Sequence, residues 1–393
     1  MHLPGRRPVG WDPEQGRPVV LEEYAGQEVF AACAFLPPAY TNLFLAPWKR
    51  CDGADPLPLY AYGAIGFLRG SFVASCIRVD ADRRQDLDQF DEEEINSRAK
   101  DLRARYPDNR LVRHLVDNCA LDYCCPAARN YVLGRWEAPI PTSPSCNADC
   151  VGCISSQSDT QIPVTQPRLR FVPEVEEIVE MAVPHLERAP RAVVSFGQGC
   201  EGEPLLQAER IEAAIREIRR RTERGTIHLN TNASRPEAVV RLVAAGLDSI
   251  RISLNSCQKE YYERYYRPKG YAFEALIRSG RAVADGGGRV CLNYFVFPGL
   301  TDTDAEYEAL SQMIREARVS VLEARNLNID PDLYIAALGL PERKAPGFGI
   351  EPWMKRVEAA YPWVRLAYFN PPREQWPPPA PPAPDPEEQR PPS

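Results

Sequence analysis

The sequence lacks any apolar run long enough to cross a membrane, and its first residues lack the apolar core of a secretion signal. These two absences predict a protein without membrane contact, and we expect it in the cytoplasm. An excess of positive charge is also missing, because the formal net charge of the 393 residues is -7. That balance disfavours a protein that holds nucleic acid through bulk charge, although it leaves a local basic groove open.

Histidine is scarce, with four residues scattered along the chain, whereas cysteine is frequent, with 12. In a reducing cytoplasm these thiols are expected to be free, which favours metal ligation or simple burial over disulfide bonds. Hydrophobic residues make up 44% of the chain, enough for a sizeable core. A chain of this length predicts more than one domain, or one large barrel with an extension.

Regular alternation of strands and helices begins near Trp136. Apolar strand-like runs, separated by helical patterns, start near Ala192, Thr226, Asp248, Arg289 and Val319. Such alternation predicts parallel strands joined by right-handed crossovers. An eight-unit barrel takes roughly 250 residues, so residues 136–335 have room for about six units. We therefore predict an α/β protein with a partial (β/α)6 barrel, whose site lies at the C-terminal ends of the strands.

Three further parts are expected outside this barrel. Residues 1–135 indicate an N-terminal α+β extension, in which two apolar runs flank a turn at Arg69-Gly70 and predict a β-hairpin. Residues 336–370 indicate a C-terminal α/β extension. Residues 371–393 are rich in proline, which cannot support a hydrogen-bonded ladder, so we predict a disordered tail.

Three of the cysteines stand close together in the run Ser-Cys-Asn-Ala-Asp-Cys-Val-Gly-Cys, residues 145–153. Their C-x3-C-x2-C spacing places the thiols of Cys146, Cys150 and Cys153 on one loop, directly after the first barrel strand. Protein clusters of four irons are normally held by four cysteines, so three ligands leave one iron open. An open metal position is where chemistry occurs. A structural zinc site would instead need a closed set of four ligands.

The second barrel strand leads into Gly-Gln-Gly-Cys-Glu-Gly-Glu-Pro, residues 197–204. Glycines let a backbone approach a ligand closely, and the carboxylate of Glu203 can bind an ammonium group. Alone, Gly-Glu-Pro is weak evidence for a site. Its position one strand after the cysteine loop makes it strong evidence.

Through these two motifs, residues 136–330 resemble the radical S-adenosylmethionine (SAM) superfamily. The resemblance implies that Cys146, Cys150 and Cys153 hold a 4Fe–4S cluster, with the amino and carboxyl groups of SAM on the open iron. It further implies that an electron from the cluster cleaves the sulfonium, giving methionine and a 5′-deoxyadenosyl radical that abstracts hydrogen from a substrate. An electron donor of the flavodoxin or ferredoxin type is implied as a partner.

The same resemblance assigns the residues that bind SAM. Gly202 and Glu203 match the family motif that binds the methionine amino group. Polar residues late on the third to fifth strands also serve SAM in this family, and here they are Asn230, Ser253, Asn255 and Asn293. For each of these four, simple capping of a loop is the alternative. The sixth strand ends in Arg325-Asn-Leu-Asn328, an unusually polar run that could face substrate or SAM or could cap a loop.

One position departs from the family pattern. Many members carry an aromatic residue just before the third cysteine, where it supports the adenine, but this chain has Gly152 there. Ligation of the cluster does not depend on that residue. The adenine contact must therefore come from elsewhere in the chain.

The remaining cysteines give weaker signals. An auxiliary cluster on Cys119, Cys124 and Cys125 is less favoured than burial, because adjacent cysteines in an extended segment point apart and no cysteine follows Cys291. Cys200 lies in the loop next to the Gly-Glu-Pro motif. It is the one candidate for a catalytic residue, as a donor or acceptor of a hydrogen atom, and simple packing is its alternative role.

Two functions from different classes remain open at this point. One is a radical SAM enzyme, for which a peptide or protein substrate would give residues 1–135 a recognition role; the acidic balance disfavours nucleic acid. The other is a non-enzymatic binding module, in which Cys146, Cys150, Cys153 and a distant ligand hold a structural zinc ion. The Gly-Glu-Pro motif and the polar strand ends favour the enzyme, because a zinc site needs neither.

Overall fold

The computed structural model describes residues 1–157, 162–341 and 346–381. Its centre is a parallel sheet of seven strands whose spatial order follows their order in the sequence. These strands are β10 (Glu137–Ile140), β11 (Val193–Phe196), β12 (Thr226–Thr231), β13 (Ser249–Leu254), β14 (Arg289–Val296), β15 (Val321–Asn326) and β16 (Arg365–Ala367). Strands β10 to β15 supply the six units predicted for the barrel, and this prediction of the fold is confirmed.

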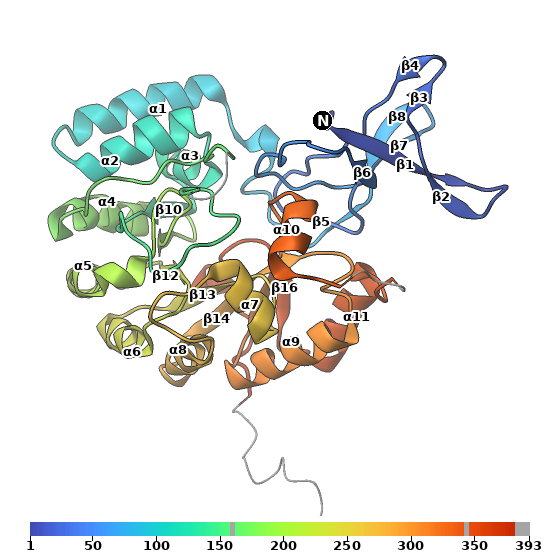
Figure 1. Cartoon of the computed structure of the whole chain (residues 1–393). Coiled ribbons are helices and arrows are strands. Elements are labelled where there is room, and N and C mark those ends of the chain that lie inside the picture. The colour runs from blue at the N-terminus through green and yellow to red at the C-terminus, as the bar shows by residue number, and fades with distance from the viewer. Residues whose placement is uncertain (158–161, 342–345, 382–393) are drawn as a thin grey trace, which may run out of the picture.

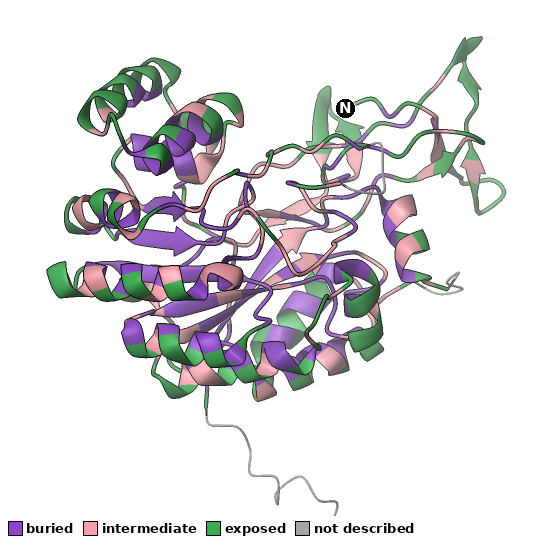
Figure 2. Ribbon diagram, turned by 60° about the vertical axis from the view of Figure 1, so that its left-hand side comes forward, coloured by how far each residue is buried: buried purple, intermediate pink, exposed green. Residues whose placement is uncertain are grey.

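Helices connect successive strands and cover the outside of the sheet (Figure 1). They are α4 (Val175–Arg188), α5 (Ala208–Arg221), α6 (Pro236–Ala245), α7 (Lys259–Tyr266), α8 (Glu274–Asp285), α9 (Asp304–Glu316), α10 (Pro331–Leu338) and α11 (Ile350–Ala360). Each helix buries one face: in α5, Ile211, Ile215 and Ile218 are fully buried at helical spacing, while three arginines fill its last turn. Figure 2 shows the buried strands inside and the exposed helix faces outside.

Small antiparallel sheets make up the first 80 residues, which project from one end of the molecule (Figure 1). Their strands are β1 (Arg6–Asp12), β2 (Arg17–Val20), β3 (Glu23–Tyr24), β4 (Gln27–Glu28), β5 (Tyr40–Asn42), β6 (Trp48–Arg50), β7 (Ile65–Leu68), β8 (Ser71–Ala74) and β9 (Cys76–Arg78). Strands β7 and β8 pair around Arg69-Gly70, which confirms the predicted hairpin.

A helical part follows and packs beside β10. It contains α1 (Glu92–Arg105), the short helix α2 (Arg110–His114), a π-helix at Leu115–Asp122 and α3 (Pro126–Val132). Its buried residues belong to the same hydrophobic core as those of the barrel. The helical part is therefore packed onto the barrel rather than tethered to it.

Buried polar contacts fasten the N-terminal strands to the barrel at the end of β15. The Arg6 guanidinium pairs with Asp330 at 2.8 Å, and neither side chain is more than 1% exposed. The side-chain oxygen of Asn326 accepts a hydrogen bond from the backbone N–H of Asn42 at 2.7 Å. These contacts place the N-terminal extension beside the C-terminal ends of the strands.

The C-terminal residues add to the barrel wall. Strand β16 pairs with β15 and comes from the segment predicted as a C-terminal extension. Beyond it, Arg289 lies over the ring of Trp376, 4.9 Å from its centre. Residues 382–393, the outer part of the predicted tail, lie outside the described residues. Within the described chain, no helix has the length and apolarity needed to span a bilayer.

Candidate active site

The cysteine loop lies at the C-terminal end of β10 and is held by the end of α7. The backbone N–H groups of Asp149 and Val151 donate to the carbonyl oxygens of Tyr266 and Tyr265, at 2.9 and 3.0 Å. Helix α7 ends there because Arg267 adopts a left-handed conformation, with φ of +46°. The loop is thus held in place by backbone contacts, and among its three sulfurs that of Cys153 contacts Ser155 and Arg168.

All three thiols of this loop line one cavity, of about 460 Å³. Burial, together with the nearby Glu203 carboxylate, raises the pKa of Cys146 to about 11. Burial also raises the pKa of Cys150 well above its usual range. At neutral pH these thiols are therefore protonated. Binding of a metal centre would release the thiol protons, because cysteine binds metal as a thiolate.

The spacing of the three sulfurs bears on the kind of metal centre. Among the described residues, a single group of three or more His, Cys, Asp or Glu residues has all its ligand atoms within 4.8 Å of one another, and it does not include these cysteines. Tetrahedral zinc with bonds of about 2.3 Å needs sulfurs roughly 3.8 Å apart. A four-iron cube separates its ligands more widely, because each thiolate binds a different iron. The loop therefore fits a cluster better than one zinc ion.

The loop after β11 lies directly against the cysteine loop. The backbone N–H of Gly202 donates to the carbonyl of Ser143 at 2.7 Å, and that of Glu203 donates to Ser145 at 2.8 Å. A Cβ on Gly202 would collide with the carbonyl oxygen of Ser145. Glycine is therefore required here for the close approach of the two loops, and Gly202 also lines the cavity.

Glu203 is buried and lines the cavity. Its carboxylate accepts hydrogen bonds from the backbone N–H groups of Leu205, at 3.0 Å, and Asn232, at 2.8 Å, and from the Thr231 hydroxyl. Burial raises the pKa of Glu203 to about 7, although these hydrogen bonds favour the ionised form. A carboxylate has about four acceptor positions, so three donors leave room for one more.

A second buried carboxylate, Glu201, was not singled out from the sequence. It accepts hydrogen bonds from the backbone N–H groups of Thr142 and Ser143, both at 2.8 Å, and of Gln198, at 2.7 Å. These bonds tie the loop after β10 to the loop after β11. Its position between Cys200 and Gly202 places Glu201 in the same loop as Glu203. The sequence does not show, however, which backbone N–H groups its carboxylate would bind.

The polar strand ends meet at the same cavity, with one exception. Asn230, Ser253 and Asn293 line the cavity, and Ser253 stands beside Asn293 in the register of β13 and β14. Asn255 does not line it, since the chain has left β13 after Leu254. Its side-chain amide instead donates to the hydroxyl of Tyr334 at 3.1 Å, in the core.

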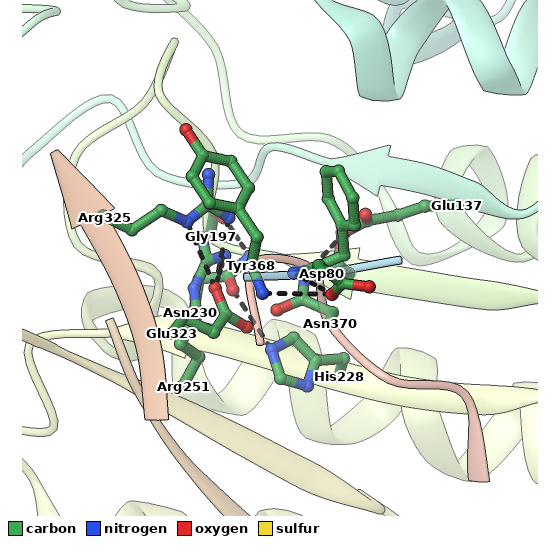
Figure 3. Close-up of polar contacts among 12 residues, drawn as sticks. Asp80, Glu137, Gly197, His228, Asn230, Arg251, Glu323, Arg325, Tyr368 and Asn370 are labelled. Carbon is green, nitrogen blue, oxygen red and sulfur yellow. Dashed lines mark hydrogen bonds and ion pairs between the residues drawn. The ribbon is translucent and has the colours of Figure 1, made fainter. Parts of the chain in front are cut away.

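Two arginines share one buried carboxylate on the cavity wall (Figure 3). Arg251 on β13 and Arg325 on β15 both donate to the same oxygen of Glu323, at 2.9 and 3.1 Å. Arg325 also lies over the ring of Tyr368, 4.0 Å from its centre. Glu323 is fully buried, whereas both arginines line the cavity. Two positive charges against one negative charge leave this wall net positive.

A polar layer bridges the first strand of the barrel and the segment after its last strand, also visible in Figure 3. The side chain of Asn370 donates to Glu137 on β10 at 2.8 Å, and Ser195 donates to the same carboxylate oxygen at 2.7 Å. Asp80, from the N-terminal extension, accepts the backbone N–H of Tyr368 at 3.0 Å. Three distant parts of the chain therefore close the wall of the partial barrel.

Two positions discussed from the sequence, Cys200 and Gly152, differ in their relation to the cavity: Cys200 lies outside it and Gly152 lines it. Cys200, the candidate for hydrogen transfer, is buried outside the cavity and contacts Cys119 and His114. Gly152 lines the cavity beside Cys153, and Tyr266 from α7 lines it too. An aromatic side chain therefore faces the cavity from α7, although none precedes the third cysteine.

A comparison with protein families finds one match, over part of the chain. The family model described as the Radical SAM superfamily matches residues 140–309, which hold the cysteine loop and strands β11 to β14. Over these residues the chain is similar to the radical SAM superfamily, and this similarity indicates an enzyme. Among curated proteins, none matches it.

Solved structures with similar folds include several radical SAM proteins, all at low identity. SuiB of Streptococcus suis bound to its precursor peptide SuiA is 14% identical, with 62% of this chain and 53% of SuiB covered and a TM-score of 0.39. A radical SAM methyltransferase from Sphaerobacter thermophilus is 17% identical, with 59% and 66% covered and a TM-score of 0.39. Spore photoproduct lyase is 17% identical, with 62% and 85% covered and a TM-score of 0.40. The chain spans about half the length of SuiB.

Proposed function

We propose that Cys146, Cys150 and Cys153 hold one 4Fe–4S cluster and that SAM binds next to it. The observation that supports this is the single cavity lined by all three cysteines, by Glu203 and by the polar ends of neighbouring strands. When bound, the cluster supplies one electron that cleaves SAM into methionine and a 5′-deoxyadenosyl radical. That radical would take a hydrogen atom from the substrate bound in the same cavity. An electron carrier of the flavodoxin or ferredoxin type is the proposed donor.

The residues around the cavity suit the polar parts of SAM. The free acceptor position on Glu203 suits the methionine ammonium group, beside the backbone of Gly202. Asn230, Ser253 and Asn293 present amide and hydroxyl groups to the cavity, and neither Ser253 nor Asn293 uses its side chain in a hydrogen bond to another described residue. The groups of Ser253 and Asn293 are therefore available to a ribose or a carboxylate, whereas the amide of Asn230 already bonds to the carbonyls of Phe196 and Gly197 and to His228.

The metal content tests this proposal. Protein purified and reconstituted without oxygen should be brown and hold about four iron atoms per chain beyond any other metal. Cys150→Ala should lower that number sharply, whereas Cys124→Ala, which changes an exposed cysteine, should not. A colourless protein whose three loop cysteines hold zinc would overturn the proposal and favour the binding module.

We further propose that the substrate is a peptide or a protein. Large apolar side chains stand exposed over the first 80 residues: Phe67 and Phe72 on the β7–β8 hairpin are 66% and 78% exposed, and their rings meet edge to face at 5.2 Å. Exposed apolar groups that gather in this way mark interaction surfaces. The net positive wall at Arg251 and Arg325 adds a place for a carboxylate, either that of SAM or one on the substrate.

Mass spectrometry of a treated cell extract tests the substrate class. The enzyme, SAM and dithionite are added to separate polypeptide and small-molecule fractions, and products that require Cys150 are sought by their change in mass. A modified polypeptide is expected, with slower modification by the Phe67→Ser, Phe72→Ser double variant and unchanged cleavage of SAM alone. Mass changes confined to the small-molecule fraction would contradict the proposal.

A further inference from the structure

A second cluster of metal-ligating side chains lies away from the proposed site, between the π-helix and the loop after β11. His114, Cys119 and Cys200 are all buried, and their ligand atoms lie within 4.8 Å of one another. The Nε2 atom of His114 is 3.4 Å from the sulfur of Cys200, and the sulfurs of Cys119 and Cys200 are 3.5 Å apart. None of the three lines the cavity of the cysteine loop.

The π-helix explains how two of these residues come together. His114 ends α2, and Cys119 lies five residues later in the π-helix Leu115–Asp122. In an α-helix, five residues turn the chain by about 500°, which would leave the two side chains about 140° apart. A π-helix hydrogen-bonds each residue to the fifth one along, so residues five apart lie on the same face. π-helical turns are rare in proteins, and those that occur are often found at functional sites.

The distances match the requirements of one tetrahedral ion. Zinc binds cysteine sulfur at about 2.3 Å and histidine nitrogen at about 2.0–2.1 Å. Tetrahedral angles then place two sulfurs roughly 3.8 Å apart and a sulfur and a nitrogen roughly 3.6 Å apart. The observed separations of 3.5 and 3.4 Å need shifts of only a few tenths of an ångström. Two sulfurs and one imidazole exclude calcium and magnesium, which prefer oxygen ligands.

The surroundings of His114 also suit a ligand. The side-chain amide of Asn118 lies 2.9 Å from its Nδ1 atom. A histidine that binds metal through Nε2 carries its proton on Nδ1 and donates it to a neighbouring acceptor, which fixes the ring. The oxygen of Asn118 takes this role when its amide is turned so that the oxygen faces the ring.

We propose that His114, Cys119 and Cys200 bind one Zn²⁺ ion. Binding replaces the two thiol protons, which are released to solvent, and it joins two thiolates and a neutral imidazole to a doubly charged ion. The net charge of this set is zero, which suits a buried site. A water molecule completes the four ligands. The ion fastens the loop that leads to Glu203 to the helical part of the N-terminal extension.

The test separates this zinc from the metal of the proposed active site. In the full chain carrying Cys146→Ala, Cys150→Ala and Cys153→Ala, elemental analysis should still find about one zinc per chain. Adding Cys119→Ala or His114→Ala should remove it, and adding Cys124→Ala should not. Loss of iron in the triple variant concerns only the proposed function, and loss of zinc concerns only this site.

X-ray absorption at the zinc edge guards against variants that fail to fold, because it needs no change to His114, Cys119 or Cys200. Two sulfur neighbours and one imidazole nitrogen are expected in the triple variant, and after exchange for cobalt a sulfur-to-metal charge-transfer band should appear. Two results would overturn the proposal. One is zinc-free protein in which Cys119 and Cys200 form a disulfide, and the other is protein supplied with zinc in which both thiols remain free.

Discussion

The hydroxyl oxygen of Tyr265 lies 2.6 Å from the point that a Cβ on Gly152 would occupy. Tyr265 is buried at the end of α7, and its carbonyl also holds the backbone of Val151. A side chain before the third cysteine would need Tyr265 to shift, because the hydroxyl of this tyrosine from α7 already fills that space. Glycine at position 152, where an aromatic residue is expected, is therefore matched to the position of Tyr265 in α7.

A side chain at position 152 should therefore destabilise the protein. Gly152→Ala is expected to lower the free energy of unfolding by about 1–3 kcal/mol, the usual range for overpacking. In the Tyr265→Phe background, which lacks the hydroxyl, the same change should cost less. Urea denaturation measures both, with Gly66→Ala, where a Cβ has ordinary contacts, as the control. Equal costs in the two backgrounds would refute the steric explanation.

The shared carboxylate of Glu323 should matter far more than a surface ion pair. Glu323→Gln leaves Arg251 and Arg325 without their carboxylate, so we expect a loss of about 3–5 kcal/mol in the free energy of unfolding. Glu351→Gln removes the exposed pair with Lys355 and should leave the free energy of unfolding nearly unchanged. Similar small costs for both variants would show that the buried network is not stabilising.

Acid should destabilise the protein partly through His185. Burial lowers the pKa of His185 to about 4, and its Nε2–H donates to the carbonyl of Trp136 at 2.8 Å. The unfolded chain binds a proton near pH 6.5, so stability falls as the pH decreases from about 6.5 to about 4, by about 3 kcal/mol in total. His185→Gln keeps a donor for Trp136 and should flatten this fall. Denaturation at several pH values measures it, and an unchanged slope, with exposed His2→Gln as reference, would contradict the assignment.

The carboxylate of Glu203 is expected to act on SAM affinity rather than on the cluster. Glu203→Gln should weaken SAM binding by roughly tenfold to a hundredfold, as expected for a hydrogen bond to a charged group, and leave the iron content unchanged. Equilibrium dialysis with reconstituted protein measures both. Glu209→Gln in the first turn of α5 is the matched control. If Glu203→Gln bound SAM as tightly as the unaltered protein does, Glu203 would not be a SAM-binding residue.

The barrel was predictable from the sequence because its signals are local. Each strand is a short apolar run with a helical pattern after it, and both the pattern and its order survive in the structure. Contacts between distant segments were not predictable. The pair Arg6–Asp330 joins residues 324 positions apart, and no local pattern marks either one as a partner of the other.

Some residues of the candidate site were likewise predictable from local sequence, and others depend on contacts between distant segments. The spacing of the cysteine loop predicts the three proposed ligands, since three thiols within eight residues must share one loop. Glu201 and Glu323 were missed, because a buried carboxylate is recognised by the donors that surround it rather than by its neighbours in sequence. Asn255 lies two residues after Ser253, so in a continued strand both side chains would point to the same face. Strand β13 ends at Leu254, however, and the alternation of side chains does not extend to Asn255. The approach of His114 to Cys119 depends on a π-helix that local spacing does not reveal, and Cys200 meets them from 81 positions further along the chain.

The most direct measurement of the central proposal is the formation of 5′-deoxyadenosine. Anaerobically reconstituted protein is incubated with SAM and dithionite, and the products are quantified by mass spectrometry. Methionine and 5′-deoxyadenosine should form in equal amounts with the unaltered chain and with Cys124→Ala, and neither should form with Cys150→Ala. Retention of 5′-deoxyadenosine formation in Cys150→Ala, or its absence from iron-loaded unaltered protein, would contradict the account.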